Sequence, residues 1–371
     1  MDINTALQAL RDPFGLPFYA WMFQGLMVLT FTLHILFVNL VVGGLAVAMY
    51  NHFKTGPERD FRQRLSAGLA QASTINLSVA IVLGVAPLLF VQVIYDPFWY
   101  ASNSLSAWWA MAFLLTITIA FLSTYVFYLK RRRNPEAWGG FAVLGLAAAV
   151  FAGVIISALS LQALLPAEWL KWYAGCGGLK TTGTGLYSFG FGRFLHFMGP
   201  ALINTGIFMM LYAWYFRPRN DIDGAYLDWV GRSGARLAKI AAMVQIVIGL
   251  WWLLSLPGEL HFMRNIYMWA GAGLGLIVMI LLLKAEADPD RWALPLAGVS
   301  FVAVLVMSIA REVLRMSYLG LYDFSIYSAR VNIDWGSTAL FFVTFVMGLV
   351  VIAWPLSIAF KLGRGTLDES V

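Results

Sequence analysis

Cysteine is almost absent from the 371-residue sequence, which contains only Cys176. A single cysteine excludes an internal disulfide, and it also excludes the CxxCH motif that attaches a c-type haem. Histidine is scarce as well, since His34, His52, His196 and His261 are the only four. Any metal bound through imidazole therefore has few residues available to it.

Charge is the next shortage. Charged residues make up 12% of the chain and hydrophobic residues 60%, with a mean hydropathy of +0.75. This composition excludes an ordinary soluble domain and predicts a polytopic membrane protein. The net charge of +6 does not indicate nucleic-acid binding, because the basic residues lie in short segments beside apolar runs. Residues 1–17 are polar and mixed, so we expect no cleavable signal peptide.

Long apolar runs are what the sequence has in abundance. Runs of about twenty residues or more predict an all-α protein with nine transmembrane helices, which form one membrane-embedded domain over residues 1–371. The expected spans are residues 18–50, 67–95, 105–129, 138–165, 192–216, 238–256, 265–283, 293–312 and 337–360.

Lysine and arginine are distributed unequally between the two sets of alternating loops. One set holds most of them, including the run from Lys130 to Arg133. The positive-inside rule therefore predicts that the N-terminus is outside and the C-terminus is cytoplasmic. Two outer loops, 166–191 and 313–336, are long and rich in Gly, Ser, Thr and Tyr, and we expect them to form an extracytoplasmic cap or a partner dock.

Polar side chains inside the spans are functional candidates by default, because burying them in a bilayer is costly. With this topology His34, His196, Met268 and Glu312 all fall in the outer half of the membrane. Each also has a plainer interpretation: a core histidine that is hydrogen-bonded, a packing methionine, or a Glu312 paired with its flanking arginines.

Together these residues resemble subunit I of the cytochrome bd quinol oxidase family, over all nine spans. The similar segments are His34-Ile-Leu-Phe-Val-Asn-Leu-Val-Val-Gly43, Arg193-Phe-Leu-His196, the Gln245 to Gly249 spacing, Ile266-Tyr-Met268-Trp-Ala-Gly271 and Arg311-Glu312-Val-Leu-Arg315. The resemblance implies the helix bundle of that subunit. It also implies that His196 and Met268 ligate a low-spin haem b, that His34 ligates a high-spin haem, and that Glu312 ligates another.

The sequence also departs from the family. Where the third span of the family carries carboxylates for the oxygen site and for proton entry, this chain has Trp108 and Thr116. The long quinol-binding loop after the sixth span is reduced to residues 256–264. The arginine expected before the methionine is Ile266, with Arg264 one turn earlier.

These features favour a haem-b membrane cytochrome that transfers electrons between the quinone pool and an extracytoplasmic redox partner. We expect one to three haems b, with haem d less favoured, and with Arg193, Arg264 and Arg315 near the propionates. The expected setting is the cytoplasmic (inner) membrane of a bacterium or archaeon. A second membrane subunit and a periplasmic subunit, such as a multihaem c-type cytochrome, are the expected protein partners.

Two alternatives stay open. The first is a divergent quinol:oxygen oxidase subunit, which would bind oxygen at a haem on His34. The second is a haem-free transporter or structural membrane subunit, in which the histidines are only packed. We therefore expect the membrane subunit of an oxidoreductase but assign no catalytic side chain.

Overall fold

A computed structural model describes residues 3–131, 133–134, 137–175 and 178–364. Cys176 lies outside these ranges. The described part of the chain is helical and has no β-strand, apart from an isolated bridge between Leu16 and Val331. The expected all-α class is therefore confirmed.

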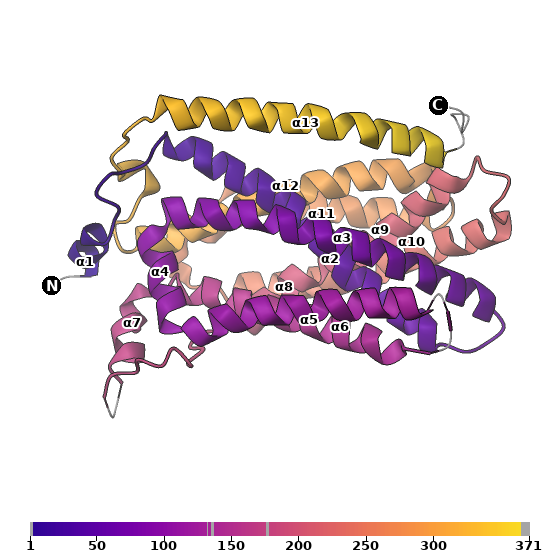
Figure 1. Ribbon diagram of the computed structural model, residues 1–371, viewed down its shortest axis with the longest axis horizontal. Coiled ribbons are helices and arrows are strands. Elements are labelled where there is room, and N and C mark those ends of the chain that lie inside the picture. Colours follow the sequence, from indigo (N-terminus) through magenta and orange to yellow (C-terminus); the bar gives the residue numbers. More distant parts are fainter. Residues whose placement is uncertain (1–2, 132, 135–136, 176–177, 365–371) are drawn as a thin grey trace.

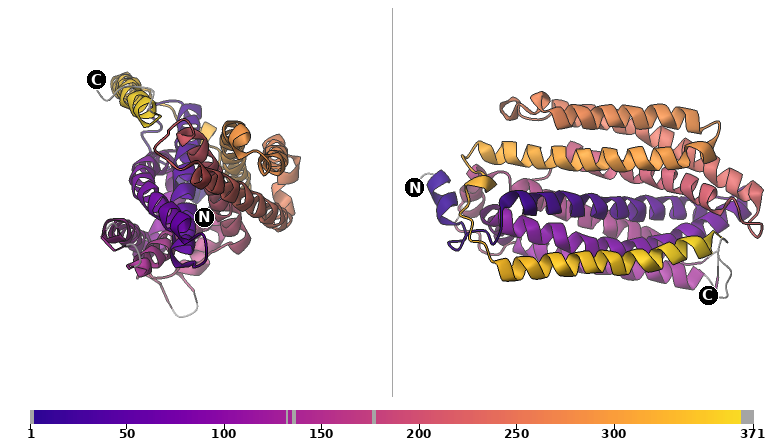
Figure 2. Two further views of the ribbon diagram at one scale, coloured as in Figure 1. Left: turned by 90° about the vertical axis from the view of Figure 1, so that its right-hand side faces the viewer. Right: turned by 90° about the horizontal axis from the view of Figure 1, so that it is seen from above.

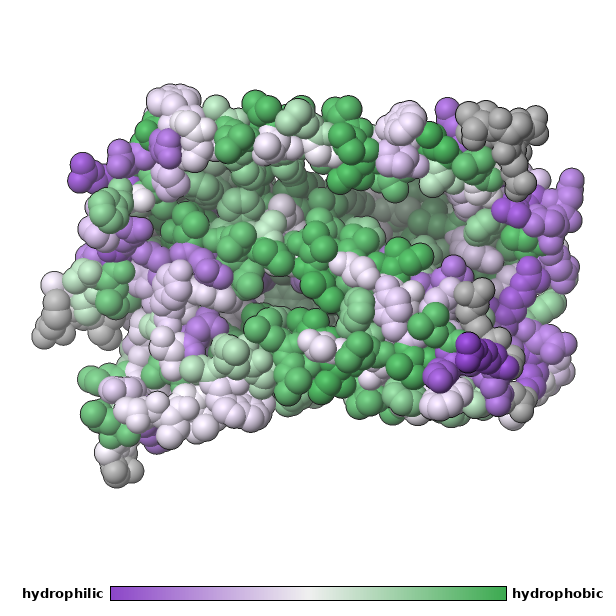
Figure 3. Space-filling model, in the orientation of Figure 1, coloured by the Kyte–Doolittle hydropathy of each residue, from purple (hydrophilic) through white to green (hydrophobic). Residues whose placement is uncertain are grey.

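Nine helices of the described chain are long and apolar enough to cross a membrane, as the sequence predicts, and they lie side by side along the long axis of the molecule (Figure 1). They are α2 (Ala20–Phe53), α3 (Arg59–Ile94), α5 (Ala107–Arg131), α6 (Gly139–Gln162), α8 with α9 (Phe191–Phe216), α10 (Gly224–Leu254), α11 (Ile266–Ala285), α12 (Pro289–Gly320) and α13 (Trp335–Gly363). On the face shown in Figure 3, apolar side chains cover the middle of the bundle, while polar ones gather at its two ends.

Several helices are longer than the apolar runs that predicted them. Helix α3 begins at Arg59, α10 begins at Gly224, and α12 continues to Gly320. A helix rises about 1.5 Å per residue, so these three extend well past a hydrocarbon core of about 30 Å. Hydropathy detects only the part inside that core, which is why the polar ends were missed. The expected outer loop 313–336 is correspondingly shorter.

The span expected as one helix over 192–216 is divided into α8 (Phe191–Met198) and α9 (Pro200–Phe216). Pro200 has no N–H to donate to the preceding turn. Gly199 keeps helical dihedral angles, φ −55° and ψ −42°, so the axis continues with little change. A Cβ at Gly199 would collide with Gln245 Oε1, and glycine there lets α10 come close to this junction.

The short helices α1 (Ile3–Ala9), α4 (Asp96–Leu105) and α7 (Pro166–Tyr173) lie together at the end of the bundle where the described chain begins (Figure 1). The end of α13 lies at the opposite end. These three short helices form a cap on the bundle. Residues 183–187 are attached to it through Gln162, the last residue of α6. Gln162 Oε1 accepts hydrogen bonds from Ser106 Oγ (3.1 Å) and Tyr187 N (3.3 Å). The expected outer loop 166–191 is therefore partly helical and is fastened to the helix ends.

Helix α13 stands apart from the bundle (Figure 2). None of its residues is buried. At the start of α13, Asp334 N donates to Pro17 O (3.1 Å), and near its end Tyr215 Oη donates to Phe360 O (2.8 Å). Helix α2 contacts α3, α6, α9 and α12, whereas α5 packs on α3 and α6, and α10 and α11 pack on each other.

Candidate functional site

His196 lies on α8 and is held on three sides. Its ring stacks on Trp252, with centroids 4.8 Å apart and planes at 28°. Gln245 Nε2 lies 3.0 Å from His196 Nδ1 and also donates to His196 O (2.9 Å). A Cβ at Gly249 would lie 3.2 Å from Nδ1, so glycine leaves the space that the ring fills. These contacts involve Nδ1 and one face of the ring, and none of them involves Nε2.

His34 lies on α2 and packs against α3. Its Nδ1 lies 2.8 Å from Ala80 O, and a Cβ at Gly84 would lie 2.7 Å from Cε1 of the ring. A carbonyl oxygen only accepts hydrogen bonds, so Nδ1 carries the proton in this contact. The neutral ring then has its lone pair on Nε2. This is the tautomer in which metal-binding histidines are usually fixed by their second nitrogen.

The Trp252 ring that stacks on His196 also lines a cavity of about 160 Å³, together with three guanidinium groups. They belong to Arg193 on α8 and to Arg311 and Arg315 on α12. The Arg311 guanidinium lies 4.1 Å from the Phe31 ring centroid, and this ring lies 6.4 Å from that of His34. The other residues that line the cavity include Phe197, Trp252, Ser255, Leu256, Leu314 and Tyr318.

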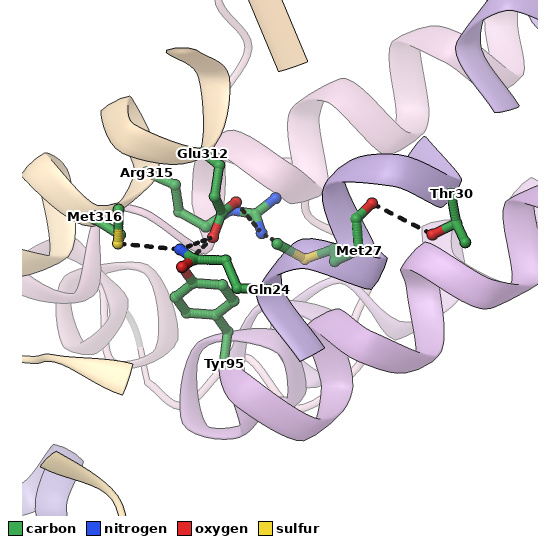
Figure 4. A network of polar contacts seen from close by, with 7 residues as sticks. All are labelled: Gln24, Met27, Thr30, Tyr95, Glu312, Arg315 and Met316. Carbon is green, nitrogen blue, oxygen red and sulfur yellow. Dashed lines mark hydrogen bonds and ion pairs between the residues drawn. The ribbon is translucent and has the colours of Figure 1, made fainter. Parts of the chain in front are cut away.

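Glu312 is buried beside this cavity, at the centre of a polar network (Figure 4). Its Oε1 accepts hydrogen bonds from Tyr95 Oη and from Gln24 Nε2 (3.3 Å). Its Oε2 lies 3.1 Å from Arg315 Nη1 as an ion pair. The arrangement matches the plainer interpretation of Glu312, since the carboxylate is already occupied by a cation and two neutral donors.

The charges around the cavity do not balance. Three guanidiniums line it, and Glu312, which pairs with Arg315, is the carboxylate beside them. Arg193 Nη1 is buried and has no hydrogen-bond partner among the described residues. A buried cation without a partner is costly in a low-dielectric environment. The site therefore has the electrostatics of an anion site, open to groups such as carboxylates.

Met268 is buried in an apolar cluster. Trp252 packs on that cluster and also stacks on His196. The indole therefore connects the methionine to the histidine, and both side chains belong to one region. Other members of the cluster are Leu260, Phe262, Ala310 and Leu314.

Of the three arginines expected near an anionic cofactor, the structure brings together Arg193 and Arg315. Arg264 lies in a short 3-10 turn, η2 (Phe262–Arg264), where it is exposed and is not among the residues that line the cavity. Arg311 lines it instead. Sequence spacing could have identified Arg311, because residues four apart share one face of a helix.

Two other residues at the site were not recognised from the sequence. They are Tyr95, which follows the last residue of α3, and Trp252, which lies on α10.

The place of His52 at the start of a basic loop predicts a solvated side chain, but the structure buries it at the end of α2. Its ring makes edge contacts with Phe53 and Phe127, and a Cβ at Gly139 would lie 2.6 Å from it. Helix α2 stays regular to Phe53, so this side chain is kept inside the bundle. His261 is exposed, as expected, with a left-handed φ of +47°.

No group of three or more His, Cys, Asp or Glu side chains that could hold a metal ion occurs among the described residues. No model of a known protein family matches the sequence, and no curated protein is similar to it.

Proposed function

We propose that this protein is a haem-b membrane cytochrome that transfers electrons between the quinone pool and a redox partner on the outer side. The observation that carries the proposal is the group of three guanidiniums, from Arg193, Arg311 and Arg315, that line one cavity together with Trp252, whose ring stacks on His196. A haem brings two carboxylates and an iron that accepts imidazole. That combination would neutralise the cations and use the ring nitrogens.

The donor set fits this cofactor. Gly84 and Gly249 provide the spaces that the two imidazoles fill, and the orphaned Arg193 Nη1 lacks an anionic partner. The cavity of about 160 Å³ is smaller than the roughly 300–1,000 Å³ typical of small-molecule pockets. It can take the carboxylate edge of a macrocycle, and side chains such as Trp252 must move to admit the rest.

The proposed ligands of a low-spin haem are His196 and Met268, and a thioether ligand raises the reduction potential of such a haem. His34 would hold a second haem through Nε2. Glu312 is the weakest of the four proposed ligands, because its carboxylate would have to exchange Tyr95 and Arg315 for iron.

The proposed orientation has α1, α4 and α7 outside and the loops richest in Lys and Arg in the cytoplasm. The cavity then lies in the outer half of the membrane of a bacterium or archaeon. An outside redox subunit would dock on the cap that these short helices form with residues 178–190, and a second membrane subunit would complete the complex.

A terminal quinol oxidase is the second candidate, favoured by the tautomer of His34, which leaves Nε2 free for a high-spin haem. Against it, the sequence of α5 from Ala107 to Arg131 contains no Asp or Glu. Reduction of oxygen to water consumes protons, so such an oxidase would need another proton route.

The deciding experiment is a reduced-minus-oxidised absorption spectrum of the purified protein, repeated after addition of carbon monoxide. A low-spin b-type signal that carbon monoxide does not shift supports the electron-transfer cytochrome. A carbon monoxide-sensitive band favours the oxidase. Purified, folded protein without haem would overturn both and leave a transporter or structural subunit.

A further inference from the structure

The amide of Gln245 is placed so that it controls which nitrogen of His196 carries a proton. Gln245 Nε2 lies 3.0 Å from Nδ1 of the ring and 2.9 Å from the backbone oxygen of the same residue. In this orientation the amide donates to both atoms, so the proton of the neutral ring sits on Nε2. That tautomer has no lone pair on Nε2 and cannot bind a metal there.

The other end of the same amide is an orphan. Gln245 Oε1 is buried and has no hydrogen-bond partner among the residues that the structure describes. A turn of about 180° about the Cγ–Cδ bond exchanges the oxygen and the nitrogen. The oxygen then accepts from Nδ1–H, which moves the lone pair of the ring to Nε2. The turn gives Oε1 a partner in Nδ1–H, whereas Nε2 gives up its hydrogen bonds to the ring and to the backbone of His196, and Oε1 must shift away from that backbone oxygen.

The space around the amide is shaped for this group by two glycines. A Cβ at Gly199 would collide with Gln245 Oε1, and one at Gly249 would press on the imidazole at 3.2 Å. Trp252 covers a face of the ring. Gln245 is the side chain that lies within hydrogen-bond distance of Nδ1.

We propose that Gln245 is a positioning residue whose amide selects the metal-binding tautomer of His196, donating to Nδ1 in the metal-free protein and accepting from Nδ1–H when Nε2 binds iron. This inference rests on the proposed haem function. Groups that accept a hydrogen bond from a metal-binding histidine fix its ring and raise its basicity, and their loss typically lowers metal affinity by about 10- to 100-fold. Gln245 would therefore affect both haem affinity and haem potential.

The test compares Gln245→Leu, Gln245→Glu and Gly199→Ala with the wild type in haem content per protein, optical spectrum and midpoint potential. We expect Gln245→Leu to lose haem by about 10- to 100-fold in affinity. The carboxylate of Gln245→Glu accepts more strongly from Nδ1–H and favours ferric iron. A tenfold preference for Fe(III) would lower the midpoint potential by about 59 mV for one electron.

Gly199→Ala tests the position of the Gln245 amide without changing Gln245 itself, because the added methyl group must displace the amide. It should weaken haem binding in the same direction as Gln245→Leu. The matched control is Gly192→Ala on the same helix, where a Cβ would meet only the Trp251 ring at an ordinary 3.7 Å. Each variant is compared at equal amounts of monodisperse protein, so that a general loss of folding is not counted as loss of haem.

The outcomes separate this inference from the function on which it rests. Wild-type protein without haem would overturn the proposed function itself. Haem that depends on His196 but keeps its content and potential in both Gln245→Leu and Gln245→Glu would overturn only the role of Gln245. Loss in Gln245→Leu and Gly199→Ala, a lower potential in Gln245→Glu, and no change in Gly192→Ala would support it.

Discussion

At the scale of single residues, the two histidines that look alike in the sequence are prepared differently. His34 donates from Nδ1 to the oxygen of Ala80, and that oxygen cannot reverse its role. His196 has an amide partner that can either donate or accept. The first ring is therefore locked in one tautomer, whereas the second can adopt either.

The simplest prediction at this scale concerns His196→Ala. Removing the imidazole should abolish the low-spin haem signal and leave the protein inserted, because one side chain does not alter nine apolar spans. The control is His261→Ala, since His261 is exposed in an outer turn. An unchanged difference spectrum in the His196 variant would contradict the ligand assignment.

A second prediction separates two arginines. Arg311 lines the cavity and Arg264 is exposed outside it. Loss of a hydrogen bond to a charged group costs about 1.5–3 kcal/mol, so Arg311→Gln should weaken haem retention by roughly 10- to 100-fold. Arg264→Gln should have little effect. Haem titration into the apoprotein measures both, and equal losses would show that the cavity does not hold the propionates.

The site illustrates what a sequence can and cannot predict. His34, His196, Met268 and Glu312 were found because polar or soft side chains are conspicuous in apolar helices. The partner of Glu312 on another helix, Tyr95, could not be found, because hydrogen bonds between distant segments leave no local pattern.

At the scale of helices, the interface of α2 and α3 depends on a missing side chain. A Cβ at Gly84 would lie 2.7 Å from the His34 ring, so Gly84→Ala should displace the imidazole and change a high-spin haem signal while sparing the low-spin one. Gly68→Ala on the same helix, where a Cβ would meet nothing within 4 Å, should only add helix propensity. Identical spectra of the two variants would argue against a haem on His34.

The cap formed by the short helices α1, α4 and α7 provides a prediction about how stability depends on pH. Burial raises the pKa of Asp96, although the Asp12 amide, which donates to it (2.9 Å), and Arg11 oppose the shift. A carboxyl with a raised pKa favours the folded state in its protonated form. Stability therefore falls as the pH rises through the ordinary Asp pKa of 3.8 towards the higher folded value.

Asp96→Asn removes this dependence, because its amide oxygen still accepts from Asp12 N and carries no charge. The effect should stay below about 1 kcal/mol, since the group is partly exposed. It is measured as the protection factor of the Asp12 amide between pH 4 and pH 7. Equal pH dependence in the wild type and the variant would mean that ionisation of Asp96 does not destabilise the cap.

The number of spans was predictable because each helix carries its own apolar run, and hydropathy reads such runs directly. The boundaries were not, since Arg59 and Gly224 begin helices in polar sequence, where capping and packing decide. The short helices α4 and α7 are amphipathic pieces at one end of the bundle, and their apolar runs are too short to be recognised as spans.

At the scale of the whole molecule, the polar network at the outer end joins parts of the chain that are far apart in sequence. Gln24 on α2 donates to Glu312 on α12 and accepts from Tyr327 Oη at 2.5 Å. Tyr327 belongs to the segment between α12 and α13. The candidate site is therefore connected to an exposed surface segment by two side-chain contacts.

Helix α13 gives this connection a consequence for the candidate site. It is held at Asp334 by the Pro17 carbonyl and at Phe360 by Tyr215, and none of its residues is buried. The segment that carries Tyr327 leads directly into this helix along the chain. A rearrangement of α13 that moves this segment would therefore be felt by Gln24 and then by Glu312.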